Sequence, residues 1–598
     1  MTSQQHRYSA YSLLLCYALI LVTGIFYYPK WKQQGTEATI SWDVSGYYMY
    51  LPALFIYKDI RQCRFGDSII QKYQPTHDFH QAYRHPSGNY VMKYAAGQAL
   101  LLSPFFFTAH AIARSSAAYE ADGFTYPYQV AIGLAALLYA LLGLWVLRKV
   151  LLRYFPDATT AVTLFVIVFG TNYLDYAAVN GAMTHNTVFT VYALLLWATV
   201  RFYEKPSAAR SLVVGALVGL ATLIRPTEII SALIPLLWHV GSVRDARQRV
   251  LFFSRDLKYT VLMGGAAIVV AGIQLLYWKL VAGEWIVYSY QQEGFDWLHP
   301  HIKNGLISFR SGWLTYSPVM VLSLAGFVWL YRRKELFVPT LVFSIIFMYL
   351  CFAWQTWWYG GSLGQRAMVQ AYPVLAFPLA AALQSLLRRS VVVRWITILF
   401  LAFCVAYNMW LTHQAHRGGL FRAGEMTGPY LRAIFGRFDV DKRVFTMLDN
   451  NVLYESIPPD AISVYTNNFE NDTAANIVAG LNGKCLFMDR DVTFSNEYMF
   501  AAPGRDVHRI RATADFLAPE LETGTWHMTQ FVLRFYRKNE MIGAHAIRVQ
   551  RVLEQGQVQA ISVDGRIPPG ADRISILFWN PGSDKKLYVD NLEVRVFR

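Results

Sequence analysis

Long apolar segments recur along most of this chain, many of them close to the length of a membrane-crossing helix. A helix needs about 20 mostly apolar residues to cross the hydrocarbon core of a bilayer. Only 16% of the residues are charged, against roughly 25% in soluble domains. These features predict a polytopic α-helical membrane protein, and they exclude a disordered chain or an ordinary soluble enzyme.

The net charge of +15 comes from lysines and arginines, many of which lie in short loops between the apolar segments. Short basic loops face the cytoplasm in membrane proteins. The positive charge therefore indicates how the chain is oriented in the membrane, and we expect no nucleic-acid partner.

The apolar segments give about eleven spans on the length criterion. The first could be a signal peptide, but the sequence Tyr-Tyr-Pro-Lys follows it instead of a small-residue cleavage site, which favours a retained span. The predicted spans are residues 11–28, 127–147, 159–175, 185–203, 210–224, 227–241, 259–279, 318–331, 336–354, 367–387 and 393–412.

One further apolar segment, residues 95–113, could cross the membrane or lie on its surface as an amphipathic helix. If it crossed, basic residues such as Arg148, Lys149 and Arg201 would face outward. If it lies on the outer surface, every short basic loop falls on the cytoplasmic side. We therefore predict a surface helix, a cytoplasmic N-terminus and a C-terminus outside.

The pattern changes near residue 418, where long apolar runs stop and period-two alternation begins, as in residues 531–536, 557–563 and 573–579. Such alternation between turn residues is typical of a β-sandwich. We predict a transmembrane domain over residues 1–415, a linker over 416–460 and an extracytoplasmic β-sandwich over 461–598.

Ionisable residues gather near the predicted outer ends of the spans, where such residues in membrane proteins usually serve a function. Taken singly, each is more often a helix cap, a snorkelling side chain or a packing residue. Together, carboxylates, imidazoles and cations on one side of the membrane suit an anionic, lipid-linked substrate. The candidates from these loops are Asp43, Tyr47, Lys93, Asp175, His185, Arg225, Glu228, Glu293, His299 and His301.

Five short motifs follow one another along the first 415 residues: Asp43 in the first external loop, Lys93-Tyr-Ala-Ala-Gly, Leu223-Ile-Arg-Pro-Thr, Gly294-Phe-Asp-Trp-Leu-His-Pro-His and Trp358-Tyr-Gly-Gly-Ser-Leu-Gly-Gln-Arg. Their order resembles the GT-C superfamily of integral-membrane glycosyltransferases, especially the bacterial aminoarabinose transferase and protein mannosyltransferase types. The chain departs from that pattern at His185, where relatives have an acidic residue, and at Tyr94, where they have proline.

The resemblance implies an enzyme of the bacterial inner membrane that moves a sugar from a polyprenyl-phosphate-linked donor to a lipid, protein or polysaccharide acceptor, with inversion at the anomeric carbon. Asp43 would be the general base. The residues Lys93, Arg225 and Arg366 would bind the donor phosphate. Asp43, His185 and His299 would form a set for a divalent metal.

The C-terminal segment resembles a carbohydrate-binding jelly roll. It begins near Thr466-Asn-Asn-Phe-Glu and ends in Lys586-Leu-Tyr-Val-Asp-Asn-Leu-Glu-Val. The resemblance implies a structural Ca²⁺ held by Glu470 and Asp590, and a role in binding the acceptor or docking a partner protein. A plain sandwich with solvated carboxylates is an equal alternative.

Other functions stay open at this point. The chain could be a transporter or scaffold for lipid-linked glycans, a ligase or polymerase that uses a diphosphate-linked donor, or an inactive relative. Transporters often have paired halves with broken helices at mid-membrane. Here the polar candidates gather on one outer face and no inverted repeat is visible, which favours the transferase.

Overall fold

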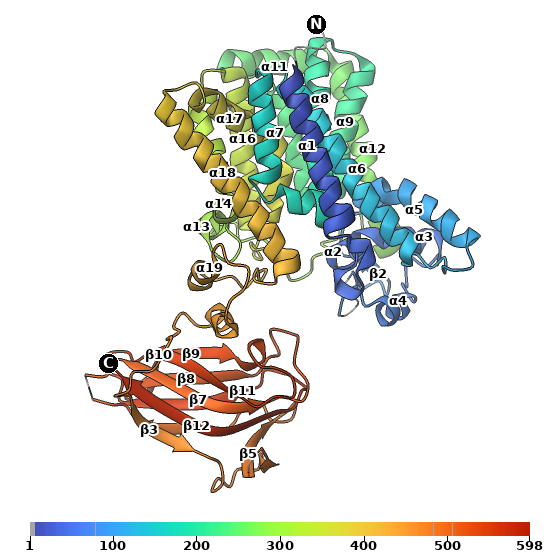
Figure 1. Ribbon diagram of the computed structural model, residues 1–598. Coiled ribbons are helices and arrows are strands. Elements are labelled where there is room, and N and C mark those ends of the chain that lie inside the picture. The colour runs from blue at the N-terminus through green and yellow to red at the C-terminus, as the bar shows by residue number, and fades with distance from the viewer. Residues whose placement is uncertain (1–5, 78, 80, 482, 505) are drawn as a thin grey trace. The chain divides into compact units, whose positions relative to one another are not determined.

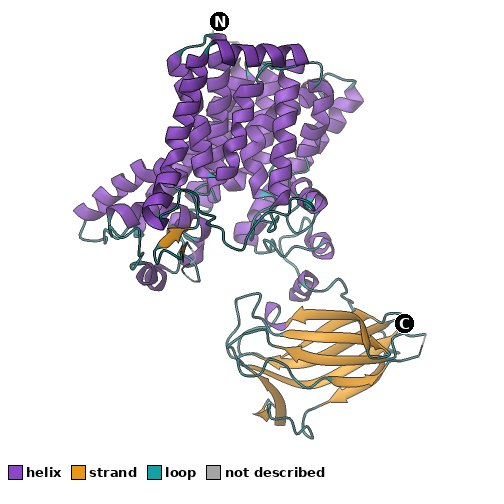
Figure 2. Ribbon diagram, turned by 180° about the vertical axis from the view of Figure 1, so that it is seen from behind, coloured by secondary structure: helices purple, strands orange, loops and turns teal. Residues whose placement is uncertain are grey.

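The computed structural model describes residues 6–77, 79, 81–481, 483–504 and 506–598. It divides into two compact units, Met1–Gly424 and Glu425–Arg598. Figure 2 shows that the first unit is almost entirely helical and that strands make up most of the second. This division confirms the predicted class, a helical domain with apolar spans followed by an all-β domain.

The first unit is a bundle of apolar helices that run side by side (Figure 1). Within the described residues, six segments are long and apolar enough to cross a membrane: Arg7–Lys32, Tyr126–Leu151, Leu257–Ala282, Lys334–Ala353, Arg366–Leu386 and Val391–Gly418. The bundle helices are α1 (Arg7–Val22), α6 (Tyr126–Leu151), α7 (Asp157–Phe169), α8 (Thr184–Glu204), α9 (Ala208–Ile224), α10 (Leu233–Leu237), α12 (Leu257–Ala282), α15 (Met320–Leu330), α16 (Lys334–Ala353), α17 (Tyr372–Leu386) and α18 (Val391–His413).

The predicted span 227–241 differs from a regular helix. It consists of the 3₁₀ turn η6 (Pro226–Ala232) followed by the short helix α10. Pro226 ends α9 because a proline has no N–H to donate and restricts the residue before it. This break places Arg225 and Glu228 at the end of the bundle rather than within a continuous helix.

The two ends of the bundle differ in the residues they carry. The amphipathic helix α11 (Val243–Arg255), with its arginines, lies at the same end as the N-terminus (Figure 1). At the opposite end, α5 (Gly97–Ser115) lies beside the end of α6 and slants away from the bundle axis. The other elements of this end layer are α2 (Trp42–Tyr48), α3 (Tyr50–Phe55), α4 (Gly66–Tyr73), β1 (Ala82–Arg84), β2 (Tyr90–Met92), α13 (Ile302–Ile307) and α14 (Trp313–Tyr316).

The second unit is a sandwich of two antiparallel sheets around one apolar core. One sheet has the order β10-β7-β12-β5-β4, with β3 also paired to β12, and the other has the order β6-β11-β8-β9. The strands are β3 (Ile462–Asn467), β4 (Ile477–Gly480), β5 (Gly483–Met488), β6 (Tyr498–Ala501), β7 (Arg509–Leu517), β8 (Gln530–Arg537), β9 (Glu540–Arg548), β10 (Gln559–Arg566), β11 (Arg573–Trp579) and β12 (Leu587–Phe597).

The segment expected to be a linker, residues 416–460, is not a separate element. From Glu425 onward it belongs to the second unit, where it forms α19 (Gly428–Ile434) and the 3₁₀ turn η9 (Lys442–Leu448). Its end is fixed to the sandwich through Asp564, whose Oδ2 accepts a hydrogen bond from the backbone N–H of Tyr454 at 2.6 Å. The same carboxylate receives both Nε and an Nη of Arg511, at 2.6 and 2.8 Å. A hydropathy pattern does not predict these contacts, because they are individual hydrogen bonds between polar groups.

We expect the sandwich to need this preceding segment for full stability. A fragment of residues 461–598 lacks Tyr454, whose backbone N–H donates to the Asp564 carboxylate and whose carbonyl accepts from Arg511. A hydrogen bond to a charged group contributes about 1.5–3 kcal/mol to stability. The free energy of unfolding of the fragment should therefore fall below that of residues 425–598, with a loss of roughly 2–4 °C in Tm for each kcal/mol. Thermal unfolding of both fragments checks this, and equal Tm values would contradict it.

Candidate active site

A cavity of about 680 Å³ lies in the first unit, lined by α2, the turn after α9, the segment after α12 and the turn η7 (Arg366–Ala371). This volume is within the range of about 300–1,000 Å³ typical of small-molecule sites. Aromatic side chains such as Tyr290 and Trp354 line it beside charged ones. The mixture suits an amphiphilic ligand with an anionic group.

Asp43 enters this cavity from the first turn of α2. Trp42, directly before it, has φ of 46°, a left-handed conformation that is uncommon for a bulky residue. The backbone N–H of Trp42 donates to the carbonyl of Pro75 at 3.0 Å, which holds the bend. Strained backbone of this kind clusters at functional sites, and here it sets the direction of the Asp43 side chain.

The carboxylate of Asp43 is held by two donors and is 23% exposed. Its Oδ2 accepts from an Nη of Arg366 at 2.7 Å, and its Oδ1 accepts from the Tyr94 hydroxyl at 2.8 Å. Burial opposes ionisation, but the charge of Arg366, the Tyr94 hydrogen bond and the charges of Lys93 and Arg225 outweigh it and lower the pKa of Asp43. The group is therefore ionised at neutral pH.

Tyr94 is a further residue of the site, although in the sequence it stands out only as a departure from the family pattern. Burial and the neighbouring Asp43 charge raise its pKa well above the usual value. Its hydroxyl thus stays protonated and serves as a donor to Asp43.

The start of α5 lies directly against the end of α9. A Cβ on Gly97 would come within 2.4 Å of the backbone nitrogen of Ile224, so only glycine permits this approach. The contact brings the chain before α5, with Lys93, next to the turn that carries Arg225. Two segments far apart in sequence therefore contribute cations to one cavity.

The three cations of the cavity differ in how fully they are paired. The Lys93 ammonium lies 2.5 Å from Glu293 Oε1, and Arg366 is paired with Asp43. Within the described residues, the guanidinium of Arg225 forms no hydrogen bond, and its Nε lies 4.0 Å from Glu228 Oε1. Arg225 thus has donors available for an anion.

Glu228 does not neutralise Arg225 closely, because other donors hold its carboxylate. The Tyr192 hydroxyl donates to Oε2, and the Gln370 side-chain amide donates to Oε1 at 2.5 Å. The same Gln370 places its Oε1 3.1 Å from His185 Nδ1. This buried network holds the Glu228 carboxylate in place, with Glu228 Oε1 4.0 Å from Arg225 Nε.

Most of the predicted site residues line this one cavity: Asp43, Tyr47, Lys93, Arg225, Glu228, Glu293 and Arg366. The residues Tyr94, Tyr290 and Gln370 also line it. Sequence reasoning did not select them; Tyr94 could have been found from its position next to Lys93, whereas nothing in the local sequence marks Gln370.

Four predicted candidates are not among its lining residues. Asp175 is buried in the π-helical turn η5 (Asp175–Val179), where it accepts from Asn180 at 3.0 Å and pairs with His416. His185 is buried against Gln370. His299 is 85% exposed, and the ring of His301 lies near that of Trp357. These side chains have structural or surface positions.

The three side chains expected to bind an active-site metal ion, Asp43, His185 and His299, are not arranged around one point in the structure. Asp43 is held by Arg366 and Tyr94, His185 is bonded to Gln370, and His299 is exposed. No cluster of three or more His, Cys, Asp or Glu residues within the described parts of the chain could hold a metal ion.

The calcium site expected in the sandwich stays a prediction. Glu470 Oε1 accepts from the backbone N–H of Lys484 at 2.9 Å, and Asp590 Oδ1 accepts from that of Asn591 at 2.7 Å. Burial and the nearby charges, that of Glu470 among them, raise the pKa of Asp590.

No protein-family model matches the chain, and no curated protein matches it. Solved structures of other proteins are similar to it, three of them as follows. ArnT from Cupriavidus metallidurans bound to undecaprenyl phosphate has a TM-score of 0.44 and 15% identity, covering 73% of this chain and 70% of that one. The same protein in the apo state has a TM-score of 0.37 and 15% identity, covering 66% and 67%. The arabinosyltransferase EmbB from Mycobacterium smegmatis has a TM-score of 0.36 and 11% identity, covering 97% and 64%. The assignment of a function therefore rests on the geometry of the cavity.

Proposed function

We propose that the first unit is a membrane glycosyltransferase that moves a sugar from a polyprenyl-phosphate-linked donor to an acceptor hydroxyl outside the cytoplasm. One observation carries the proposal: an ionised carboxylate, Asp43, and an arginine with unused donors, Arg225, line the same amphiphilic cavity. A base beside an anion site is what transfer from a lipid phosphate requires.

In the proposed reaction, the acceptor hydroxyl oxygen attacks the anomeric carbon of the donor sugar. Its proton passes to a free lone pair of the Asp43 carboxylate, which acts as general base. The bond from the anomeric carbon to the phosphate oxygen breaks, and the phosphate leaves with the electron pair. Arg225 and Lys93 bind the departing phosphate through charge-assisted hydrogen bonds. A single displacement inverts the anomeric configuration.

Arg366 acts both before and after the proton passes to Asp43. Before transfer, its pairing with Asp43 orients the carboxylate. When Asp43 takes the proton, the attraction between the two weakens, and the Arg366 guanidinium becomes available to the phosphate. The pair thus links proton transfer to stabilisation of the leaving group.

The direct test is turnover of a labelled polyprenyl-phosphate sugar by the purified chain in lipid nanodiscs, with membrane extract as the acceptor source. We expect the label to move to an extract component, whose chemistry then names the acceptor. Donor that binds but is never consumed would contradict the proposal and indicate a transporter, a scaffold or an inactive relative. Consumption of a diphosphate-linked donor alone would indicate a ligase or polymerase.

Replacing Tyr94 with phenylalanine should move the acid limb of the kcat/KM profile toward higher pH. The Tyr94 hydroxyl stabilises the ionised form of Asp43, so its loss raises the pKa of that carboxyl. Tyr290→Phe is the matched control, because Tyr290 lines the cavity without a hydrogen bond to Asp43. If the acid limb of Tyr94→Phe lies at the same pH as that of the wild type, the Tyr94 hydroxyl does not stabilise the ionised form of Asp43.

A further inference from the structure

The neighbouring helices α6 and α8 end in the same sequence pattern, a tryptophan followed four residues later by a cation: Trp145 and Lys149 in α6, and Trp197 and Arg201 in α8. Residues four apart lie on the same face of a helix. Both helix ends lie on the N-terminal side of the bundle, where Arg148 of α6 donates to the carbonyl of His6 at 3.1 Å. The cavity that contains Asp43 lies at the opposite end.

The α6 and α8 helices pack so closely that these residues meet. A Cβ on Gly143 of α6 would come within 2.6 Å of Thr190 Oγ1 on α8. Further toward the helix ends, Lys149 Nζ lies 3.4 Å from the ring centre of Trp145 and 5.8 Å from that of Trp197. An ammonium group within about 6 Å of a ring centre is attracted to the indole. Lys149 therefore contacts a tryptophan of each helix.

Two arginines lie beside the same Trp197 ring. The guanidinium carbon of Arg153, which follows α6, is 5.3 Å from the ring centre, and that of Arg201 is 5.9 Å away. Three cations from two helices thus surround one indole. We call Lys149, Arg153, Arg201 and the two tryptophans, Trp145 and Trp197, the α6–α8 cluster.

The α6–α8 cluster carries more positive than negative charge. Glu204 pairs with Arg153 at 2.9 Å and with Arg201 at 2.7 Å. Lys149 lies over the indole rings and forms no ion pair within the described part of the chain. Three cations and one carboxylate leave an excess of two positive charges. Arg210 adds a further charge, because it donates to the carbonyl of Arg201 at 2.6 Å and pairs with no carboxylate among the described residues.

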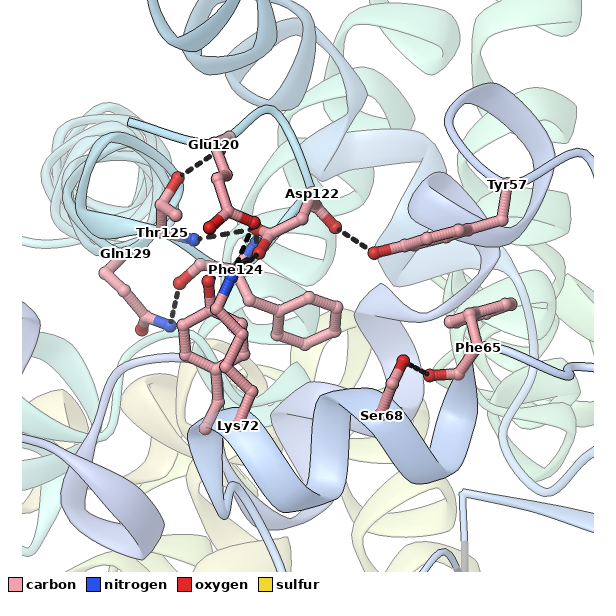
Figure 3. Close-up of polar contacts among 10 residues, drawn as sticks. Tyr57, Phe65, Ser68, Lys72, Glu120, Asp122, Phe124, Thr125 and Gln129 are labelled. Carbon is pink, nitrogen blue, oxygen red and sulfur yellow. Dashed lines mark hydrogen bonds and ion pairs between the residues drawn. The ribbon is translucent and has the colours of Figure 1, made fainter. Parts of the chain in front are cut away.

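A lysine at the opposite end of the bundle has the reverse balance of charge. Lys72 lies 2.7 Å from Glu120 and 3.0 Å from Asp122, and Figure 3 shows the three groups converging between α4 and the loop before α6. Two carboxylates there neutralise one cation. The α6–α8 cluster lacks such neutralisation, so its charges attract an anion from outside the chain.

An exposed apolar stripe of α6 leads to the cluster. Leu134, Leu138 and Trp145 are 44%, 53% and 42% exposed, and their spacing places them on one face of the helix. In a chain that spans a membrane, an exposed leucine of a bundle helix contacts lipid acyl chains, which are as apolar as leucine itself. Tryptophans are enriched at the depth of the lipid headgroups. The cluster thus combines an acyl-chain surface with cations at headgroup depth.

We propose that the α6–α8 cluster binds an anionic phospholipid of the membrane leaflet on the N-terminal side. The headgroup phosphates accept charge-assisted hydrogen bonds from Lys149, Arg153 and Arg201, and an acyl chain packs along the α6 stripe. Basic pockets between membrane helices bind multiply charged headgroups in this way. The excess of two positive charges matches a lipid with two phosphates, so cardiolipin is the probe. A soluble phosphate would gain nothing from the apolar stripe.

The test titrates lipid onto the full chain, purified in detergent and freed of bound lipid, and measures binding by native mass spectrometry. We expect cardiolipin to bind at least about tenfold more tightly than phosphatidylcholine with the same acyl chains. The triple variant Lys149→Ala/Arg153→Ala/Arg201→Ala should raise the Kd for cardiolipin by about 10–100-fold. Equal Kd values for the two lipids in the wild type would overturn the proposal.

The matched control is Arg388→Ala/Arg389→Ala/Arg394→Ala, which removes three exposed arginines near the start of α18, at the same end of the bundle. Its Kd for cardiolipin should stay close to that of the wild type. Equal rises of Kd in the two triple variants would indicate a general attraction between lipid and a basic surface, and the proposal would then be wrong. Glycerol phosphate, which has a headgroup phosphate without acyl chains, should not displace cardiolipin. Displacement would mean that the cluster recognises a free phosphate instead.

Photo-crosslinking is a second measurement that does not depend on the variants. Cardiolipin with a diazirine on one acyl chain, added in equimolar amount to the wild type, should label residues 134–153 or 194–205. Label confined to other segments would contradict the proposal. Neither measurement uses a sugar donor or an acceptor, so the outcome does not depend on the proposed transferase function.

Discussion

Replacing Asp43 with asparagine is expected to slow sugar transfer by about 10²–10⁴-fold, the usual contribution of a general base. Asparagine has nearly the same shape, and its single amide oxygen can keep one of the two hydrogen bonds that hold the native carboxylate, from Tyr94 at 2.8 Å or from Arg366 at 2.7 Å. It cannot take a proton from the acceptor hydroxyl. The measurement is the single-turnover rate at saturating donor, which separates the chemical step from product release.

The matched control is Asp296→Asn, a partly exposed carboxylate that does not line the cavity. It should leave the rate unchanged. If the transfer rate of Asp43→Asn equals that of the wild type, Asp43 is not the base. Equal rates in the two variants, both far below the wild type, would instead indicate a general loss of folded protein.

The pH dependence of the wild type follows from the same carboxylate. Burial raises the pKa of Asp43, but the charge of Arg366 and the Tyr94 hydrogen bond outweigh it and hold that pKa below its ordinary value of about 3.9. The base therefore stays ionised to strongly acidic pH. Its ion pair contributes stability above the unfolded pKa, and this contribution is lost as pH falls through the lowered pKa. Transfer should therefore show no loss attributable to this group between pH 5 and 7.

The fold could be predicted where hydropathy alone decides it. Segments of about 20 apolar residues must be helical in a membrane because no water satisfies the backbone, and strict alternation reports a half-buried strand. Pro226 stands directly before residues 227–241 and Pro235 lies within them, in a segment that forms a 3₁₀ turn and a short helix instead of one regular span. Average hydropathy does not detect such irregularities. Residues 425–460 pack through individual polar contacts such as Tyr454 with Asp564, which have no periodic pattern.

The sequence was enough to predict most of the charged residues of the site, but not the directions and partners of their side chains. The sequence places Asp43, Lys93 and Arg225 in loops at one end of the bundle, but it does not show which way each side chain points. His185 has the expected sequence position, yet the α8 helix turns it toward Gln370 rather than Asp43. The pairing of Asp43 with Arg366 joins residues more than 300 positions apart, and only the folded chain reveals it.

Replacing Arg225 with alanine is expected to have the second-largest effect, because this guanidinium has donors that the protein itself leaves unused. A charge-assisted donor to a developing anion in a dry site contributes about 3–4 kcal/mol, which corresponds to a fall of roughly 10²–10³-fold in kcat/KM. The Kd for polyprenyl phosphate without sugar should rise as well, since the phosphate is present before and after transfer. Both quantities are measured on protein in nanodiscs.

Arg225→Lys distinguishes charge from geometry. A lysine keeps the positive charge but cannot present the planar, paired donors that match two phosphate oxygens, so it should recover only part of the lost binding. Arg84→Ala, an exposed arginine of β1 in the same end layer, is the control and should change neither quantity. Since Glu228 is held by Tyr192 and Gln370, Arg225→Ala should unfold at nearly the wild-type temperature. An unchanged Kd for polyprenyl phosphate in Arg225→Ala would show that the lipid phosphate does not bind to Arg225. The proposed position of the departing phosphate would then be wrong as well.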